Sequence, residues 1–155
     1  MKINFYVGAV LIDLKKAFDT VDHQISLKKL FCLYGFRHQS FEWIESYLSN
    51  RFQMTKFNDS ISDLVQEKTY GVPQGSVLGP LFFLIYINDI SSVMSGFYHL
   101  YADDTIFIHY NKSKISLVNS LNNQMTSLSS WLSLNKLTLN LKKTERQFSL
   151  VMKGK

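Results

Sequence analysis

Residues 99–110 read HLYADDTIFIHY and place two carboxylates, Asp103 and Asp104, side by side between two strand-forming stretches. Tyrosine, isoleucine, phenylalanine and threonine favour strands on both sides of the pair. We therefore predict a hairpin over 97–110 with the two aspartates at or near its turn. Taken alone, the pair is most simply interpreted as a polar turn, because aspartate is common there. Adjacent negative charges nevertheless repel each other and favour a positively charged partner.

A third carboxylate ends a second predicted strand. The stretch INFYVGAVLID (3–13) is rich in β-branched and aromatic residues, is apolar enough for a central strand, and finishes with Asp13. If this strand neighbours the hairpin, Asp13 lies beside Asp103. Carboxylates gathered at one edge of a sheet repel unless a divalent cation neutralises them, and oxygen ligands favour Mg²⁺ or Mn²⁺. Paired ions in such a site can support a phosphoryl displacement.

The rest of the chain predicts further helices and strands, with no internal repeat and no linker. We predict helices over about 23–34, capped by Asp22, about 41–49, capped by Ser40, Pro80 to about 92, and about 115–134. Two strands are predicted around a turn at 58–60. The stretch KLTLNLKKT (136–144) predicts a short strand or an extended loop, and we expect no closing element after it. These elements predict an α+β fold, with helices packed on one face of a sheet.

Composition places the chain among globular proteins. It has 155 residues, 46% of them hydrophobic and 14% aromatic, which suits one domain and excludes the highly charged disordered class. Its formal net charge of +5 is compatible with a nucleic-acid partner and equally with an ordinary basic protein. The single cysteine fits a reducing compartment. The longest apolar run, PLFFLIYI (80–87), is far shorter than the roughly 20 residues of a membrane span, so we expect no membrane partner.

Four stretches of the sequence, in order, resemble the palm region of reverse transcriptases from non-LTR (LINE-like, jockey- or CR1-type) retrotransposons. They are LIDLKKAFDTVDH (11–23), YGVPQGSVLGPLFFLIYINDI (70–90), YADDT (101–105) and NKLTLNLKKTE (135–145). A fifth, SYLSNRFQ (46–53), is similar to a stretch characteristic of this subgroup, and the likeness covers about residues 9–145. Reverse transcriptases of the group II intron or retron type are a weaker alternative. SYLSNRFQ and GVPQGSVLGP favour the non-LTR group.

The resemblance implies a polymerase palm-type antiparallel sheet, RNA-directed DNA polymerase activity and a two-metal site for Mg²⁺, with Mn²⁺ as an alternative. By this resemblance Asp13, Asp103 and Asp104 bind the metal ions, and the backbone carbonyl of Leu14 adds a further oxygen. Lys143 is then the general acid for the departing pyrophosphate, although its neighbour Lys142 is one position away and stays an alternative.

The same resemblance implies a nucleotide pocket. Its residues are Ala17, Phe18, Gln74 and Gly75. The Phe18 ring would lie under the sugar and exclude a 2′-hydroxyl, whereas packing in the core is the competing interpretation of this residue. Other basic side chains could contact phosphates or form an ordinary solvated surface. These are Lys15, Lys16, Lys28, Lys29 and Arg51.

The implied partners are an RNA template, a DNA primer and deoxynucleoside triphosphates. We expect residues 1–155 to form a single reverse-transcriptase domain fragment, the palm with part of the fingers at about 36–70, without most of the fingers, the thumb and the endonuclease. The expected location is intracellular, the nucleus for the parent element and otherwise the cytoplasm. The competing hypothesis is a truncated, non-catalytic remnant of a retroelement that at most binds nucleic acid.

Overall fold

The computed structural model describes residues 3–49, 51–63, 65–66, 70–73, 75–101 and 104–153. The chain forms two compact units, Met1–Ala17 with Ile87–Lys155, and Phe18–Tyr86. No helix in the described part of the chain is long and apolar enough to cross a membrane.

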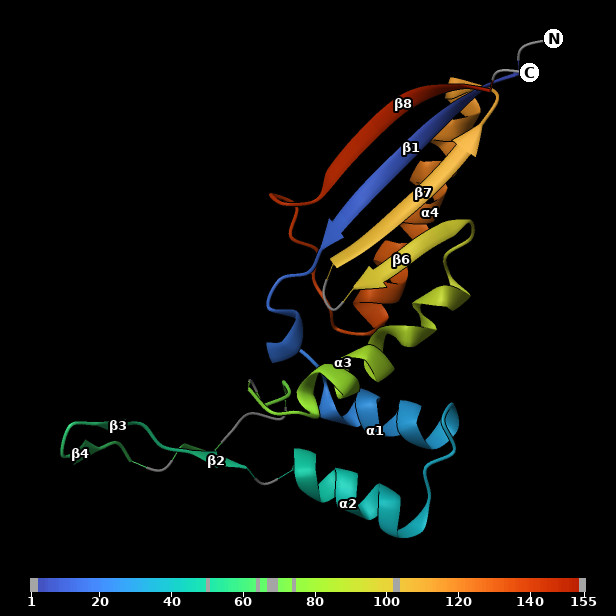
Figure 1. Cartoon of the computed structure of the whole chain (residues 1–155). Helices are drawn as coiled ribbons and strands as arrows, with labels where there is room; N and C mark the ends of the chain where they lie inside the picture. Colours follow the sequence, from blue (N-terminus) through green and yellow to red (C-terminus); the bar gives the residue numbers. More distant parts are fainter. Residues whose placement is uncertain are drawn as a thin grey trace. The chain divides into compact units, whose positions relative to one another are not determined.

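The first unit is built on a four-stranded antiparallel sheet with the order β6-β7-β1-β8 (Figure 1). Strand β1 (Ile3–Asp13) is central, as predicted, and β6 (Phe97–Tyr101) and β7 (Asp104–Asn111) form the predicted hairpin. Asp104, the second of the two adjacent aspartates, is the first residue of β7.

The fourth strand corrects our expectation for the end of the chain. Residues Glu145–Lys153 form β8, which pairs with β1 from Leu11↔Glu145 to Ile3↔Lys153. We expected no closing element after Thr144, because ERQFSLVMK mixes charged and apolar residues without a strict alternation. An edge strand tolerates such a sequence, since its backbone hydrogen bonds to a neighbour provide the order.

One long helix covers one face of this sheet. Helix α4 (Lys114–Leu134) packs on β1 and β7 and lies behind the sheet in Figure 1. Along β7 the residues alternate, so that Thr105 and Phe107 are buried while Asp104 and Ile106 are exposed. The core between helix and sheet is apolar and comprises Val10, Ile12, Phe107, Leu117, Leu121, Leu128 and Leu132. The α+β fold with a helix on one face of an antiparallel sheet is confirmed.

Among its described residues, the second unit contains the α-helices α1 (His23–Cys32), α2 (His38–Leu48) and α3 (Gly79–Ile87), whose last residue already belongs to the first unit. The predicted cap of α1 is confirmed, because the Asp22 carboxylate accepts a hydrogen bond from the Ile25 amide at 2.9 Å. The predicted start of α2 is wrong. Ser40 lies inside the helix and donates its hydroxyl to the Arg37 carbonyl at 2.8 Å, so it cannot act as the N-cap.

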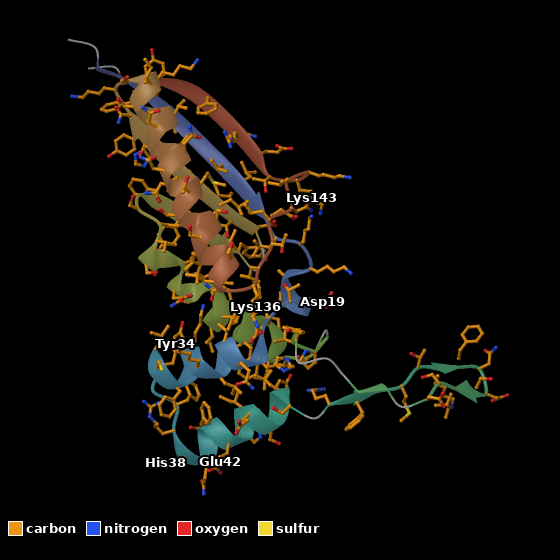
Figure 2. All side chains as sticks on the ribbon, turned by 180° about the vertical axis from the view of Figure 1, so that it is seen from behind. Asp19, Tyr34, His38, Glu42, Lys136 and Lys143 are labelled. Carbon is orange, nitrogen blue, oxygen red and sulfur yellow. The ribbon has the colours of Figure 1, made fainter. Side chains whose placement is uncertain are left out.

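Lys29 of α1 and Tyr34, which follows the helix, connect this segment to the last turn of α3. The Lys29 ammonium donates to the Tyr86 carbonyl at 2.6 Å and lies 4.8 Å from the centre of the Tyr86 ring. Tyr34, labelled in Figure 2, donates its hydroxyl to the Ile85 carbonyl at 3.1 Å. Lys29 is therefore neither a solvated lysine nor a phosphate contact in this structure, because its side chain is buried and bonded to a helix end.

Short strands follow α2. Strand β2 (Phe52–Gln53) pairs with β5 (Val65–Gln66), and β3 (Lys56–Phe57) pairs with β4 (Ser60–Ile61) around the predicted turn. The turn residue Asn58 has a φ of 51°, which asparagine tolerates better than most residues. In Figures 1 and 2 this arm extends away from the helices of its unit.

Candidate metal centre and nucleotide loop

Two of the predicted carboxylates face each other across adjacent strands. In the register of β1 and β7, Asp13 is the direct partner of Asp104. Directly opposed residues in an antiparallel pair have Cα atoms about 4.5–5.5 Å apart and side chains on the same face. Because the next pair, Ile12↔Thr105, is buried, the two aspartates lie on the opposite face, the one that α4 does not cover.

The third predicted carboxylate, Asp103, lies outside the described residues. Among the residues that the structure describes, no group of three or more His, Cys, Asp or Glu side chains is placed to hold a metal ion. The two described carboxylates fit a magnesium site that takes few protein ligands and obtains its other oxygens from water and substrate phosphates.

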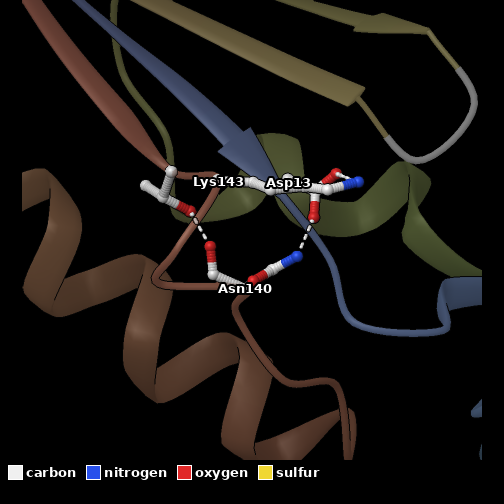
Figure 3. Close-up of polar contacts among 4 residues, drawn as sticks. Asp13, Asn140 and Lys143 are labelled. Carbon is white, nitrogen blue, oxygen red and sulfur yellow. Dashed lines mark hydrogen bonds and ion pairs between the residues drawn. The ribbon is translucent and has the colours of Figure 1, made fainter.

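The Asp13 carboxylate has two described neighbours, shown in Figure 3. The side-chain amide of Asn140 donates to Oδ2 at 2.7 Å, and the Lys143 ammonium lies 3.8 Å from Oδ1. The Asp13 side chain is 19% exposed and the Lys143 side chain 70%. Of the two lysines that the sequence leaves open, Lys143 is thus the one that the structure brings to Asp13.

A turn brings these neighbours to the end of β1. Leu14 is buried and forms an antiparallel bridge with Leu139, and the Lys15 amide donates to the Thr138 carbonyl at 2.8 Å. The chain then turns at 141–143 before β8 begins. Ala17, which follows in a short 3₁₀ helix (Ala17–Asp19), is buried.

The other predicted residues lie in the second unit, on two segments that pair with each other. The Gly71 amide donates to the Val21 carbonyl at 2.7 Å, and the Val72 amide donates to the Phe18 carbonyl at 2.8 Å. His23, which is 8% exposed, joins the same pairing, because its Nε2 lies 2.6 Å from the Gly71 carbonyl. A carbonyl only accepts, so this nitrogen donates.

Three of the predicted nucleotide-pocket residues belong to these two segments. The Phe18 ring is half-buried and packs on the Phe83 ring, with centroids 4.7 Å apart. Gly75 is exposed, with a φ of 78°, and no atom lies within 4 Å of the point where a Cβ would stand. Gln74 lies outside the described residues.

Comparison with known proteins identifies the family. Residues 2–149 match the family described as reverse transcriptase (RNA-dependent DNA polymerase). The chain belongs to the reverse transcriptase family. It is 30% identical over 136 residues to the probable RNA-directed DNA polymerase from transposon BS of Drosophila melanogaster. It is 29% identical over 135 residues to the RNA-directed DNA polymerase from mobile element jockey of Drosophila funebris. Each alignment covers 81% of this chain and 14% of the relative.

Solved structures of two telomerase chains share the fold. Apo telomerase from Candida tropicalis, truncated from its C-terminal domain, superposes with a TM-score of 0.68 at 14% identity. That superposition covers 93% of this chain and 31% of the telomerase chain. Telomerase from the same organism in complex with a fragment of telomeric RNA gives a TM-score of 0.63 at 15% identity, over 93% of this chain and 26% of that one. The resemblance to non-LTR retrotransposon enzymes is confirmed by the jockey and transposon BS relatives.

Sequence reasoning missed the partners of two residues of this region, Asn140 and His23. Asn140 lies three positions before Lys143 within a stretch used for the resemblance, and His23 ends another such stretch, so both were visible but had no assigned partner. Their partners, Asp13 and Gly71, are 127 and 48 residues away along the chain. Only the fold connects them.

Proposed function

We propose that this chain carries the nucleotidyl-transfer centre of an RNA-directed DNA polymerase, with Asp13, Asp103 and Asp104 as ligands of two Mg²⁺ ions. The supporting observation is the register pairing of Asp13 with Asp104 in a chain of the reverse transcriptase family. The chain spans 14% of the length of the curated relatives cited above, so the activity of a whole polymerase enters here only as a proposal.

Bound divalent ions supply charge neutralisation to the attacking hydroxyl and to the leaving oxygen of an in-line displacement. In this proposal Asp13, Asp103 and Asp104 hold the ions at the strand ends, together with the Leu14 carbonyl. The Lys143 ammonium then donates a proton to the departing pyrophosphate. Its exposed side chain, close to Asp13, is compatible with that role.

The nucleotide residues complete the proposal. Gln74 and Gly75 contact the incoming nucleotide, Ala17 lines its pocket, and the Phe18 ring excludes a 2′-hydroxyl by steric clash. The half-buried Phe18 ring, supported by Phe83, is compatible with a surface that is rigid on one side and available on the other. A ring fully enclosed in the core would not suit this role.

The substrates we propose are an RNA template, a DNA primer and deoxynucleoside triphosphates. The excess of basic residues, 17 against 12 acidic ones, favours binding of such polyanions. We further propose that the domain organisation is that of a palm with part of the fingers at about 36–70, and that the parent element acts in the nucleus.

Primer extension on an RNA template with Mg²⁺ tests the proposal. We expect the chain to extend a DNA primer, and Asp103→Asn, Asp13→Asn or Asp104→Asn to reduce the rate roughly 100-fold or more, because each removes a negative ligand of the metal. Asp59→Asn, at an exposed turn of the β3–β4 hairpin, is the matched control and should extend as the wild type does. Binding of the primer–template with no extension would favour the non-catalytic remnant.

A further inference from the structure

Backbone hydrogen bonds connect the turn between α4 and β8 to the end of β1. The Asn140 amide donates to the Asp13 carbonyl at 2.8 Å, next to the bridge between Leu14 and Leu139. These contacts fix residue 140 beside residue 13 independently of either side chain.

The side chain of Asn140 adds a contact of a different kind. Its Nδ2 donates to Oδ2 of Asp13 at 2.7 Å (Figure 3). The other carboxylate oxygen of Asp13, Oδ1, lies 3.8 Å from the Lys143 ammonium. A carboxylate can rotate about its terminal bond, and a short hydrogen bond to one oxygen restricts that rotation. The two oxygens of Asp13 are therefore not equivalent in this structure, because the amide holds only one of them.

Asn140 is itself held from the other side. Its carbonyl accepts from the Thr144 amide at 2.9 Å and from the Thr144 hydroxyl at 3.0 Å, and also from the Lys143 amide at 3.0 Å. The Asn140 side chain, which donates the hydrogen bond to Asp13, thus belongs to a turn whose backbone is itself hydrogen-bonded. These bonds fix the backbone from which the Asn140 side chain reaches the Asp13 carboxylate.

We propose that Asn140 is a positioning residue that orients the Asp13 carboxylate for a divalent metal ion, with Thr144 holding Asn140 in place. This proposal rests on the proposed function, since it takes Asp13 as a metal ligand. Groups that hydrogen-bond to a ligating carboxylate typically change metal affinity 10- to 100-fold when they are removed, because the free ligand then samples orientations that do not bind.

Binding of Mn²⁺ to the whole chain, followed by the electron paramagnetic resonance signal of the free ion, tests this role. We expect Asn140→Ala to raise the dissociation constant about 10- to 100-fold. Asn123→Ala, an exposed asparagine on α4, is the matched control and should leave Mn²⁺ binding unchanged. Thr144→Val should weaken binding less than Asn140→Ala, and Thr144→Ser, which keeps the hydroxyl, should restore it.

A second comparison separates positioning from a purely structural tie. In an Asp13→Asn background, Asn140→Ala should have no further effect on Mn²⁺ binding, because the two changes act through one carboxylate. Circular dichroism of each variant reports the fold. If Asn140→Ala lowers the thermal midpoint but changes the Mn²⁺ dissociation constant less than twofold, the positioning role is wrong.

The same titration distinguishes failure of the inference from failure of the proposed function. Wild-type binding of Mn²⁺ that Asp13→Asn does not weaken would contradict the metal centre itself, and with it the inference. Wild-type binding that depends on Asp13 but not on Asn140 would overturn the inference and leave the metal centre standing.

Discussion

Asp13 and Asp104 are register partners at the end of the two central strands, the last residue of β1 and the first residue of β7. Their pairing follows from the whole ladder between the strands, which runs without interruption from Tyr6↔Asn111 to Asp13↔Asp104. A slip of one residue would turn Asp104 to the buried face beneath α4, where a carboxylate is costly. The pairing of β7 with β1 and the burial of Thr105 and Phe107 against α4 therefore fix the position of the charge.

A first prediction concerns Gly71, whose φ is 90°. A Cβ here would lie 3.1 Å from the Asp19 carbonyl oxygen and 3.2 Å from its Cα, both backbone atoms. We expect Gly71→Ala to lower the free energy of unfolding by about 2–4 kcal/mol, because an unfavourable backbone conformation and a steric clash add together. Chemical denaturation of the purified variant measures the loss.

Gly35→Ala is the matched control for that change. Gly35 also has a positive φ, 71°, but nothing lies within 4 Å of its Cβ position. We expect a loss of only about 1 kcal/mol from the backbone conformation. Equal losses at the two glycines would show that the close approach of Gly71 to Asp19 has no energetic consequence.

Lys29 provides the second prediction. Lys29→Met keeps the aliphatic volume and removes the hydrogen bond to the Tyr86 carbonyl, so we expect a loss of about 1–3 kcal/mol in unfolding free energy. The neighbouring Lys28 is exposed, and Lys28→Met should change stability by less than about 0.5 kcal/mol. Two variants of equal stability would contradict the structural role of the buried ammonium.

The third prediction concerns β8. A chain that ends after Thr144 loses the strand that pairs with β1 along nine register positions, and it exposes that edge of the sheet. We expect the truncated chain to be less stable by on the order of 3 kcal/mol and to aggregate more readily. Thermal unfolding with parallel light scattering checks both effects. A truncated chain as stable and soluble as the whole one would show that β8 contributes no stability.

The elements that the sequence predicted share a strong local signal. The predicted strand over 3–13 has the same bounds as β1, because this stretch is apolar and β-branched and ends at a charge. The predicted helix over about 115–134 begins one residue after the observed start of α4, because its leucines recur at helical spacing. Such signals need no knowledge of distant partners.

The elements that were missed depend on distant partners. Strand β8 is ordered by pairing with β1, and Lys29 is buried because the end of α3 offers a carbonyl 57 residues away. The predicted start of α2 is wrong for a local reason. Serine is a residue type favoured at N-caps, but the Ser40 hydroxyl donates to the Arg37 carbonyl. Propensity identifies the residue type and not the direction of its hydrogen bond.

The candidate site divides in the same way. The sequence indicated Asp13 and Asp104, and the register of two strands brought them together. It gave no reason to single out Asn140, since an asparagine in a polar turn is unremarkable until the fold places it 2.7 Å from a carboxylate. Reasoning from residue types finds charged candidates more readily than the neutral groups that hydrogen-bond to them.

Iron-directed cleavage tests the central claim, that the ends of β1 and β7 form one divalent-metal site. Fe²⁺ bound in place of Mg²⁺ generates hydroxyl radicals with ascorbate and peroxide, and these cut the backbone close to the ion. We predict cuts near both Asp13 and Asp104 in the wild-type chain, suppressed by excess Mg²⁺ and lost in Asp13→Asn. Cuts confined to other parts of the chain, or cuts at these two positions that neither Mg²⁺ nor the substitution affects, would contradict the account.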